Sequence, residues 1–212
     1  YYFFKDPKYA FYSLINLIKH PFIGGVSIGN HKSIFYNDIY KDFRKTRIDF
    51  LVSIFGKEWF NNKKIIEFGS GNGEISKYFF DIGSSVLCCE GRKELVRDIK
   101  ERYQGFEVIK LNNDTQWDNL FEKKEFDLAI HWGLLYHLEN WERDLVNVLR
   151  VAKIVCLESE VLSSNADDEF RRNEFGHDQG LSNIGTYVSS QKIEKILHFY
   201  DRLKLLFFLI SL

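Results

Sequence analysis

The chain alternates between short apolar runs and longer stretches in which apolar residues recur every three or four positions. Runs rich in β-branched residues predict strands, and they lie at 65–68, 86–89, 108–111, 126–130 and 154–157. Between them, stretches such as 75–82 and 141–152 keep the spacing of amphipathic helices. Strands that alternate with helices predict a parallel sheet covered on both faces, because crossover connections are right-handed. We therefore predict a doubly wound α/β fold with a mostly parallel, Rossmann-like sheet.

The first sixty residues follow another pattern. Helical spacing predicts helices over 8–19 and 40–54, separated by a glycine-containing break at 24–33. We predict that 1–60 form a helical extension of the same domain as 61–212. The aromatic residues at its start are expected to pack on the sheet, with a lid over the site and a surface for a partner as alternatives.

The composition is that of an ordinary globular protein, with 45% of the 212 residues hydrophobic, 28% charged and only 2 prolines. This excludes disordered, collagen-like and low-complexity classes. The formal net charge of −1 provides no overall field for nucleic acid, so an RNA partner is not favoured. Cys88, Cys89 and Cys156 lie in predicted strands without the spacing of a zinc site, and the longest apolar run, 205–212, is too short to cross a membrane. We expect a reduced, cytoplasmic protein with no membrane attachment.

A glycine-rich turn directly follows the first predicted strand. It reads Glu67-Phe-Gly69-Ser70-Gly71-Asn-Gly73, and a predicted helix begins after it. Glycines let the backbone turn tightly and approach a ligand, and the free N–H groups at the start of the helix lie at the same place. A turn without a ligand is the alternative, but three alternating glycines and an acid exceed what a turn requires. Because such sheets bind ligands at the carboxyl ends of their strands, we predict a cofactor loop here.

The acidic residues around this turn narrow the choice of cofactor. A dinucleotide fold has a third glycine where this chain has Glu74, and Glu67 would repel a pyrophosphate in a crevice of low dielectric constant. No Gly-Lys-Ser/Thr follows, which excludes a P-loop. Glu90 ends the second strand, where an acid can accept both ribose hydroxyls; a solvated carboxylate at the start of the next helix is the alternative. Asn113 and Asp114 follow the third strand and are available to an adenine amino group, with a turn as the alternative. We favour a cationic, ribose-bearing cofactor, with a nicotinamide dinucleotide as an alternative.

Two segments resemble the class I S-adenosylmethionine-dependent methyltransferases. Residues 64–74 are similar to that family's glycine-rich first motif, and 126–138 are similar to its fourth motif, where the strand end passes the methyl group. The resemblance implies a seven-stranded type of sheet, S-adenosylmethionine as cofactor and methyl transfer as the reaction. It implies cofactor contacts from these residues: Glu67, Gly69, Ser70, Gly71, Gly73, Glu90, Gly91, Asn113, Asp114, Trp132 and His137. The family's sheet usually ends with an antiparallel strand pair, and because few residues follow the predicted helix 190–202, we expect the last strand to be missing or disordered.

Weaker similarities rank the acceptors. Residues 133–137 look like the corresponding stretch of transfer-RNA wobble-uridine enzymes and of several sugar methyltransferases, and 178–185 are faintly similar to the sugar group. The Asn-Pro-Pro-Tyr type of motif for nitrogen acceptors is absent. We therefore expect O-methylation of a small-molecule or sugar-like acceptor. The alternatives are a transfer-RNA nucleoside methyltransferase and a cofactor-binding partner subunit without catalysis.

Several polar residues near the ends of the later strands are candidates for chemistry. His131 closes the fourth strand and is expected to point into the crevice, where it can take a proton from a hydroxyl; a backbone-bound core histidine is the alternative. His177 is a second catalytic candidate, in a polar stretch, 165–183, that is predicted to form a substrate loop or lid. Glu158 and Glu160 face one side of the fifth strand and can bind polyol hydroxyls, although a solvated strand end is favoured. We predict no metal site.

Basic residues cluster in two predicted helices. They are Lys41, Arg44, Lys45 and Arg47 in the first cluster, and Lys100 and Arg102 in the second. Acidic residues lie among them, so we predict solvated helical faces rather than phosphate contacts.

Overall fold

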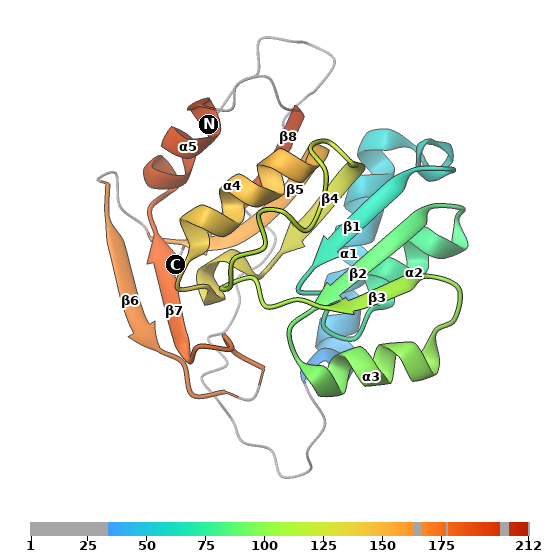
Figure 1. The fold of residues 1–212 in the computed structure, drawn as a ribbon, viewed down its shortest axis with the longest axis horizontal. Helices are drawn as coiled ribbons and strands as arrows, with labels where there is room; N and C mark the ends of the chain where they lie inside the picture. Colours follow the sequence, from blue (N-terminus) through green and yellow to red (C-terminus); the bar gives the residue numbers. More distant parts are fainter. Residues whose placement is uncertain (1–33, 163–166, 177, 200–203, 212) are drawn as a thin grey trace. The chain divides into compact units, whose positions relative to one another are not determined.

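The structure, a computed structural model, describes residues 34–162, 167–176, 178–199 and 204–211. This part of the chain contains eight strands, most of them preceded or followed by a helix (Figure 1). The strands are β1 Lys64–Phe68, β2 Ser85–Glu90, β3 Glu107–Lys110, β4 Phe126–Trp132, β5 Ala152–Val161, β6 Glu169–Asn173, β7 Ile184–Val188 and β8 Lys204–Ser211. The helices are η1 Ile34–Tyr36, α1 Asp38–Phe55, η2 Lys57–Phe60, α2 Glu74–Asp81, α3 Lys93–Arg102, η3 Leu135–His137, α4 Trp141–Val151 and α5 Ser190–Phe199.

Six of these strands form one sheet in the order β3-β2-β1-β4-β5-β8, and every neighbouring pair is parallel. The doubly wound α/β prediction is confirmed, and each of the five predicted strands is present. The strand order reverses between β1 and β4, because the chain leaves β1 toward β2 on one side and returns to β4 on the other. The carboxyl ends of β1 and β4 therefore border the crevice in which such sheets bind ligands.

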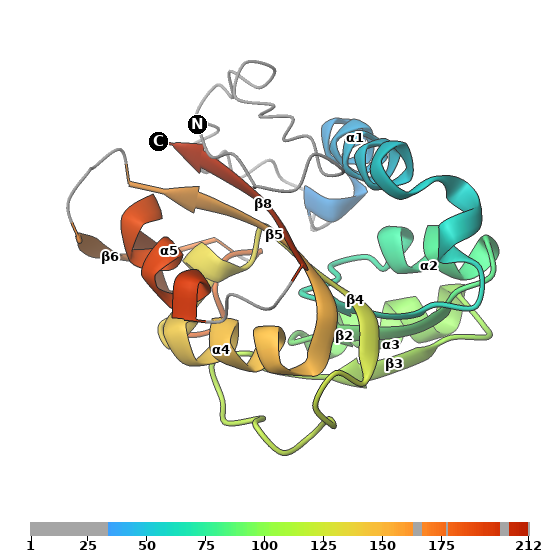
Figure 2. The ribbon, with the colours of Figure 1, turned by 90° about the horizontal axis from the view of Figure 1, so that it is seen from above.

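Helices cover both faces of the sheet (Figure 2). On one face, Ile48 and Leu51 of α1 and Phe79 of α2 pack against inward residues of β1 and β4. On the other, Leu145 of α4 and Ile193 of α5 share a core with the alternate residues of the same strands. Both clusters are apolar, which explains why the central strands carry almost uninterrupted hydrophobic runs. Among the described helices, none combines the length and apolar composition needed to span a bilayer.

The region after β5 differs from its prediction in two ways. Part of the polar stretch expected to form a loop is instead strand β6, which pairs with β7 in an antiparallel hairpin. The residues after α5 form a further strand, β8, which pairs in parallel with β5 from Ile154 to Val161. The described sheet has six strands and no antiparallel pair, so the expectation that the family's last strand is missing or disordered stays a prediction. The predicted helix over 8–19 and the aromatic start of the chain lie outside the described residues.

Candidate functional site

The glycine-rich loop joins β1 to α2 at the reversal point of the strand order. Gly69, Gly71 and Gly73 have φ angles of 64°, 55° and 74°, in the left-handed region that other residues rarely adopt. A Cβ on Gly69 would lie 3.0 Å from Leu134, and one on Gly71 would lie 2.9 Å from the ring of Phe35. The loop therefore requires glycine for its conformation and for the close approach of its neighbours.

Glu90 connects the end of β2 to this loop. Its Oε2 accepts the N–H of Gly71 at 2.8 Å, and its Oε1 accepts the N–H of Arg92 at 2.9 Å. Burial raises the pKa of Glu90, and these backbone N–H groups and the Arg92 charge lower it in part. The carboxylate thus lies at the edge of the glycine loop, as expected for a group that binds ribose hydroxyls.

The loop after β3 provides an unpaired acceptor. One oxygen of Asp114 accepts the N–H of Asn140 at 2.8 Å, while its Oδ2 is buried and has no hydrogen-bond partner among the described residues. An unpaired buried carboxylate oxygen is costly unless a donor reaches it, and an exocyclic amine such as that of adenine is a suitable donor. Asn113 does not offer such a group, because its amide donates to Asp144 at 2.7 Å.

Four predicted cofactor residues face other parts of the protein. Glu67 accepts the N–H and hydroxyl of Ser76 at 2.9 and 2.5 Å, on the α2 side of the sheet. Burial raises the pKa of Glu67 to about 7, although the Ser76 hydrogen bonds lower it in part. Ser70 bonds the carbonyl of Cys89, and Trp132 donates to the sulfur of Cys156, so both lie in the core. A Cβ on the fourth residue, Gly73, would meet Ile99 of α3 at 3.0 Å, so that glycine serves helix packing.

His131 lies in the core. Its side chain is fully buried, and Nε2 lies 2.8 Å from Oδ2 of Asp144 on α4. The other oxygen of Asp144 accepts hydrogen bonds from Asn113 and from the Trp117 indole. This contradicts the expectation that His131 points into the crevice, because the alternation along β4 turns the side chain toward α4. A catalytic role for His131 stays a prediction that this placement does not favour.

His137 has a similar partner in a different setting. Its Nδ1 lies 2.7 Å from Oε2 of Glu174, in the connection between β6 and β7. The side chain of His137 is 14% exposed, whereas that of Glu174 is 2% exposed. The imidazole is thus held at the rim of the crevice, three residues after Leu134, which covers Gly69.

A polar cluster lies beside His137, between α1 and the carboxyl ends of β4 and β5. Arg47 donates from Nε to Glu158 at 2.7 Å, and its Nη2 bonds the second oxygen of the same carboxylate. Burial raises the pKa of Tyr40 and of Tyr136, so both phenols keep their hydrogens beside this pair. Glu160 lies two residues further along β5, on the same side of the strand, and is half-buried.

Two predictions about solvated residues are therefore wrong. Glu158 is bound by Arg47 and is only 8% exposed, so it is not a solvated strand end. In the first basic cluster, Arg44 is buried and paired with Glu74, and Arg47 is largely buried and paired with Glu158, so neither is on a solvated face; Lys41 and Lys45 are exposed as predicted. A signal was present, since 44, 47, 48 and 51 lie on one helical face with the core residues Ile48 and Leu51.

The connection between β6 and β7 spans the two sides of the crevice. Arg92 donates to the carbonyl of Gln179, and a Cβ on Gly91 would collide with Leu181. At the other side, Glu174 of the same connection contacts His137 at 2.7 Å, and it also accepts the N–H of Gly180 at 2.9 Å. The sequence did not single out Glu174, and no local pattern identifies it. His177, also in this connection, lies outside the described residues.

Comparison with known proteins places this geometry in context. The chain matches the family described as methyltransferase domain over residues 40–201. The N-terminal domain of EvdMO1 with SAH bound has a TM-score of 0.60 at 19% identity, covering 74% of this chain and 70% of that chain. The same domain in the presence of SAH and D-fucose has a TM-score of 0.61 at 19% identity, covering 74% and 72%. The YcgJ protein of Bacillus subtilis has a TM-score of 0.51 at 10% identity, covering 74% and 68%. No curated protein matches the sequence.

The α/β fold has a glycine loop after β1 and an acid at the end of β2. These are features of the class I S-adenosylmethionine-dependent methyltransferases. The family match covers most of the chain, so the chain belongs to the methyltransferase domain family. It is an S-adenosylmethionine-dependent methyltransferase, and the enzyme class and cofactor expected from the sequence are confirmed.

Proposed function

We propose that the enzyme methylates a hydroxyl group of a small, sugar-like acceptor. The observation that carries this proposal is Glu160, a half-buried carboxylate at the carboxyl end of β5, two residues beyond the pair of Glu158 and Arg47. Burial raises its pKa, while the charges of His137 and Arg172 lower it in part. A carboxylate in such a position can accept hydrogen bonds from vicinal hydroxyls, and the phenol of Tyr136 is available beside it.

Residues around the loop fit the methyl donor. In this proposal Gly69 and Gly71 lie under its methionine part, Glu90 accepts the ribose hydroxyls, and Oδ2 of Asp114 accepts the adenine amino group. The donor supplies a methyl carbon made electrophilic by the neighbouring sulfonium. The protein's own contribution is to align the acceptor oxygen with that carbon and to exclude water, which lowers the barrier by several kcal/mol.

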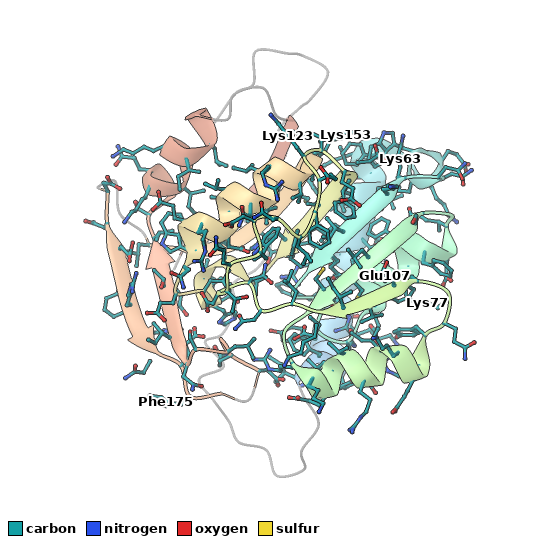
Figure 3. The ribbon with its side chains drawn as sticks, viewed as in Figure 1. Lys63, Lys77, Glu107, Lys123, Lys153 and Phe175 are labelled. Atoms are coloured by element: carbon teal, nitrogen blue, oxygen red, sulfur yellow. The ribbon has the colours of Figure 1, made fainter. Side chains whose placement is uncertain are left out.

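The distribution of lysines favours a small acceptor over RNA. Lys63, Lys123 and Lys153 lie at the amino ends of β1, β4 and β5, the edge opposite the crevice (Figure 3). At the crevice side, Arg44 and Arg47 are both engaged by carboxylates. A groove that follows an RNA backbone needs unengaged cations near the reacting base, and these three lysines lie at the opposite edge of the sheet.

Methyl transfer to a panel of acceptors tests the proposal. Deoxy sugars come first, because the related EvdMO1 domain was crystallised in the presence of D-fucose; free nucleosides and transfer RNA complete the panel. We expect S-adenosylhomocysteine release with sugars, and a KM for the sugar that rises about tenfold in Glu160→Gln, the scale of one lost hydrogen bond to a charged group. Glu107→Gln, at an exposed position of β3, is the matched control. Methylation of transfer RNA with no sugar methylated would overturn the proposal.

A further inference from the structure

His137 and Glu174 are arranged as a proton-accepting imidazole and a carboxylate that orients it through a hydrogen bond. We propose that Nε2 of His137 takes the proton of the acceptor hydroxyl, and that Glu174 is the positioning residue for this imidazole. The inference rests on the proposed function, because a hydroxyl acceptor must lose a proton during transfer. Neither residue lies in the glycine-rich motif, and Glu174 comes from the β6–β7 connection.

The hydrogen bond fixes the tautomer of the ring. A carboxylate only accepts, so the hydrogen in the 2.7 Å contact belongs to Nδ1 of His137. The lone pair is then on Nε2, the nitrogen that remains available for a substrate. Burial alone would raise the pKa of Glu174, but its hydrogen bond to His137 and the charge of that ring lower it, so the carboxylate is charged when the imidazole takes up a proton.

The protein builds a close-fitting pocket around the Glu174 carboxylate. Gly180 donates its N–H at 2.9 Å, and the hydroxyl of Tyr187 donates to the second oxygen at 3.3 Å. A Cβ on Gly180 would lie 3.2 Å from this carboxylate, and one on Gly185 would collide with it. The two glycines therefore let the backbone enclose the acid, which is the construction expected for a fixed support.

The chain turns sharply at this point. Glu174 is 3% exposed, whereas Phe175 is 90% exposed and projects from the surface beyond the hairpin (Figure 3). The acid is thus directed inward by the same turn that directs its neighbour to solvent. On the other side of the pair, the Tyr136 ring lies 4.1 Å from the His137 ring and limits its rotation.

Charged and titratable groups from every packed element bear on His137. Glu174 contacts the ring directly, and the charges of His137 and of Arg172 of β6 both lower the pKa of Glu160 of β5. Tyr136 of η3 and Tyr187 of β7 stay neutral, because burial raises the pKa of both phenols. Two carboxylates, Glu160 and Glu174, thus lie near the ring on which the proposed step places a positive charge.

The step balances without any further reactant. The acceptor oxygen forms its bond to the methyl carbon as the carbon–sulfur bond of the donor breaks, and that electron pair stays on sulfur. The hydroxyl proton passes to Nε2 of His137, and the positive charge lost from sulfur is now on the imidazolium beside Glu174. Solvent takes the proton after the product leaves.

Kinetic measurements on the enzyme, with a sugar that it methylates as the acceptor, test the assignment. We expect His137→Gln to lower kcat about 10²–10⁴-fold, the usual contribution of a general base, with unchanged affinity for S-adenosylhomocysteine. In the wild type, kcat rises with pH as the imidazole loses its proton and then becomes constant. Glu174→Gln should lower the constant rate and move this rise to lower pH, because the carboxylate no longer stabilises the imidazolium. Glu107→Gln should change neither. A rise that stays in place in both His137→Gln and Glu174→Gln would overturn the inference.

Nitrogen-15 NMR of the histidine rings separates this inference from the acceptor assignment. The wild type should show a hydrogen on Nδ1 of His137 that is protected from solvent exchange, and Glu174→Ala, which leaves no acceptor at this position, should expose it. If no sugar is methylated but this hydrogen is present, the proposed function fails and the pair stands. If His137 carries its hydrogen on Nε2 near neutral pH, the inference is wrong whatever the acceptor.

Discussion

The two histidine–carboxylate pairs have almost the same separation, 2.8 Å for His131–Asp144 and 2.7 Å for His137–Glu174, but different surroundings. In the first pair both side chains are fully buried, and in the second the imidazole is 14% exposed. His131 belongs to a strand and faces a helix, whereas His137 follows the strand end and faces a hairpin connection. The same kind of histidine–carboxylate contact therefore stabilises the core at His131, and in our proposal it supports a reaction at His137. The two sites differ in whether the imidazole is accessible.

The partners of the two acids sharpen this contrast. Asp144 accepts hydrogen bonds from Asn113 and Trp117 as well as contacting His131, so it joins the β3 loop, β4 and α4. Glu174 joins one imidazole to a single hairpin. Removal of the first acid should therefore affect the whole fold, and removal of the second should affect mainly the site.

The largest effect is expected from Asp144→Ala. The substitution leaves the side chains of His131, Asn113 and Trp117 without their acceptor in the core, and breaking such a buried pair costs about 3–5 kcal/mol. Urea unfolding measures the loss. The control is Asp49→Ala, in an exposed pair with Lys45, which should change stability by less than about 0.5 kcal/mol. Equal losses in both variants would remove the distinction between the core pair and a surface pair.

Glu67→Gln measures the cost of burying the carboxylate of Glu67 in the folded protein. Burial raises the pKa of Glu67 from 4.5 to about 7, so the folded protein holds this proton more tightly than the unfolded chain. Stability from this group is present below 4.5 and is lost as the pH rises through 7, by roughly 3 kcal/mol. Glutamine does not ionise, so its stability does not fall in this way. In unfolding experiments, the free energy of unfolding of the variant relative to that of the wild type should therefore increase by that amount between about pH 5 and about pH 9. If the free energies of unfolding of the two proteins depend on pH in the same way, the raised pKa of Glu67 is contradicted.

The smallest effect on stability is expected from His137→Ala. The ring lies at the rim and contacts Tyr136 and Glu174, so its removal should lower the free energy of unfolding by less than about 1 kcal/mol. Thermal unfolding and the methyl-transfer assay on the same sample test this together. A loss of stability as large as that of Asp144→Ala would show that both pairs are structural.

The sequence predicted the sheet because β-branched runs and helical spacing are local signals. It placed the ends of β4 and β5 too early, at 130 and 157, because the polar residues there break the apolar pattern. The backbone nevertheless continues to pair, as Glu158 does with Phe208 of β8. Main-chain hydrogen bonds do not depend on side-chain polarity, so an apolar pattern underestimates strands that end in a site.

The site was predictable only where its parts are adjacent in sequence. The glycine loop and Glu90 follow their strands directly, and the structure brings them together. The pair of His137 and Glu174 joins residues 37 positions apart, through a hairpin in a stretch that was predicted to be a loop. For His131, strand alternation alone leaves the choice of face open, and the packing of α4 settles it.

The parallel pairing of β8 with β5 affects how this protein is synthesised. β5 is ten residues long, and its outer edge finds its partner only after the hairpin and α5 have left the ribosome. Until then its main-chain N–H and C=O groups stay open to strands of other chains, a known route to aggregation. A nascent chain of this enzyme is therefore expected to depend most on chaperones between the emergence of β5 and the emergence of β8.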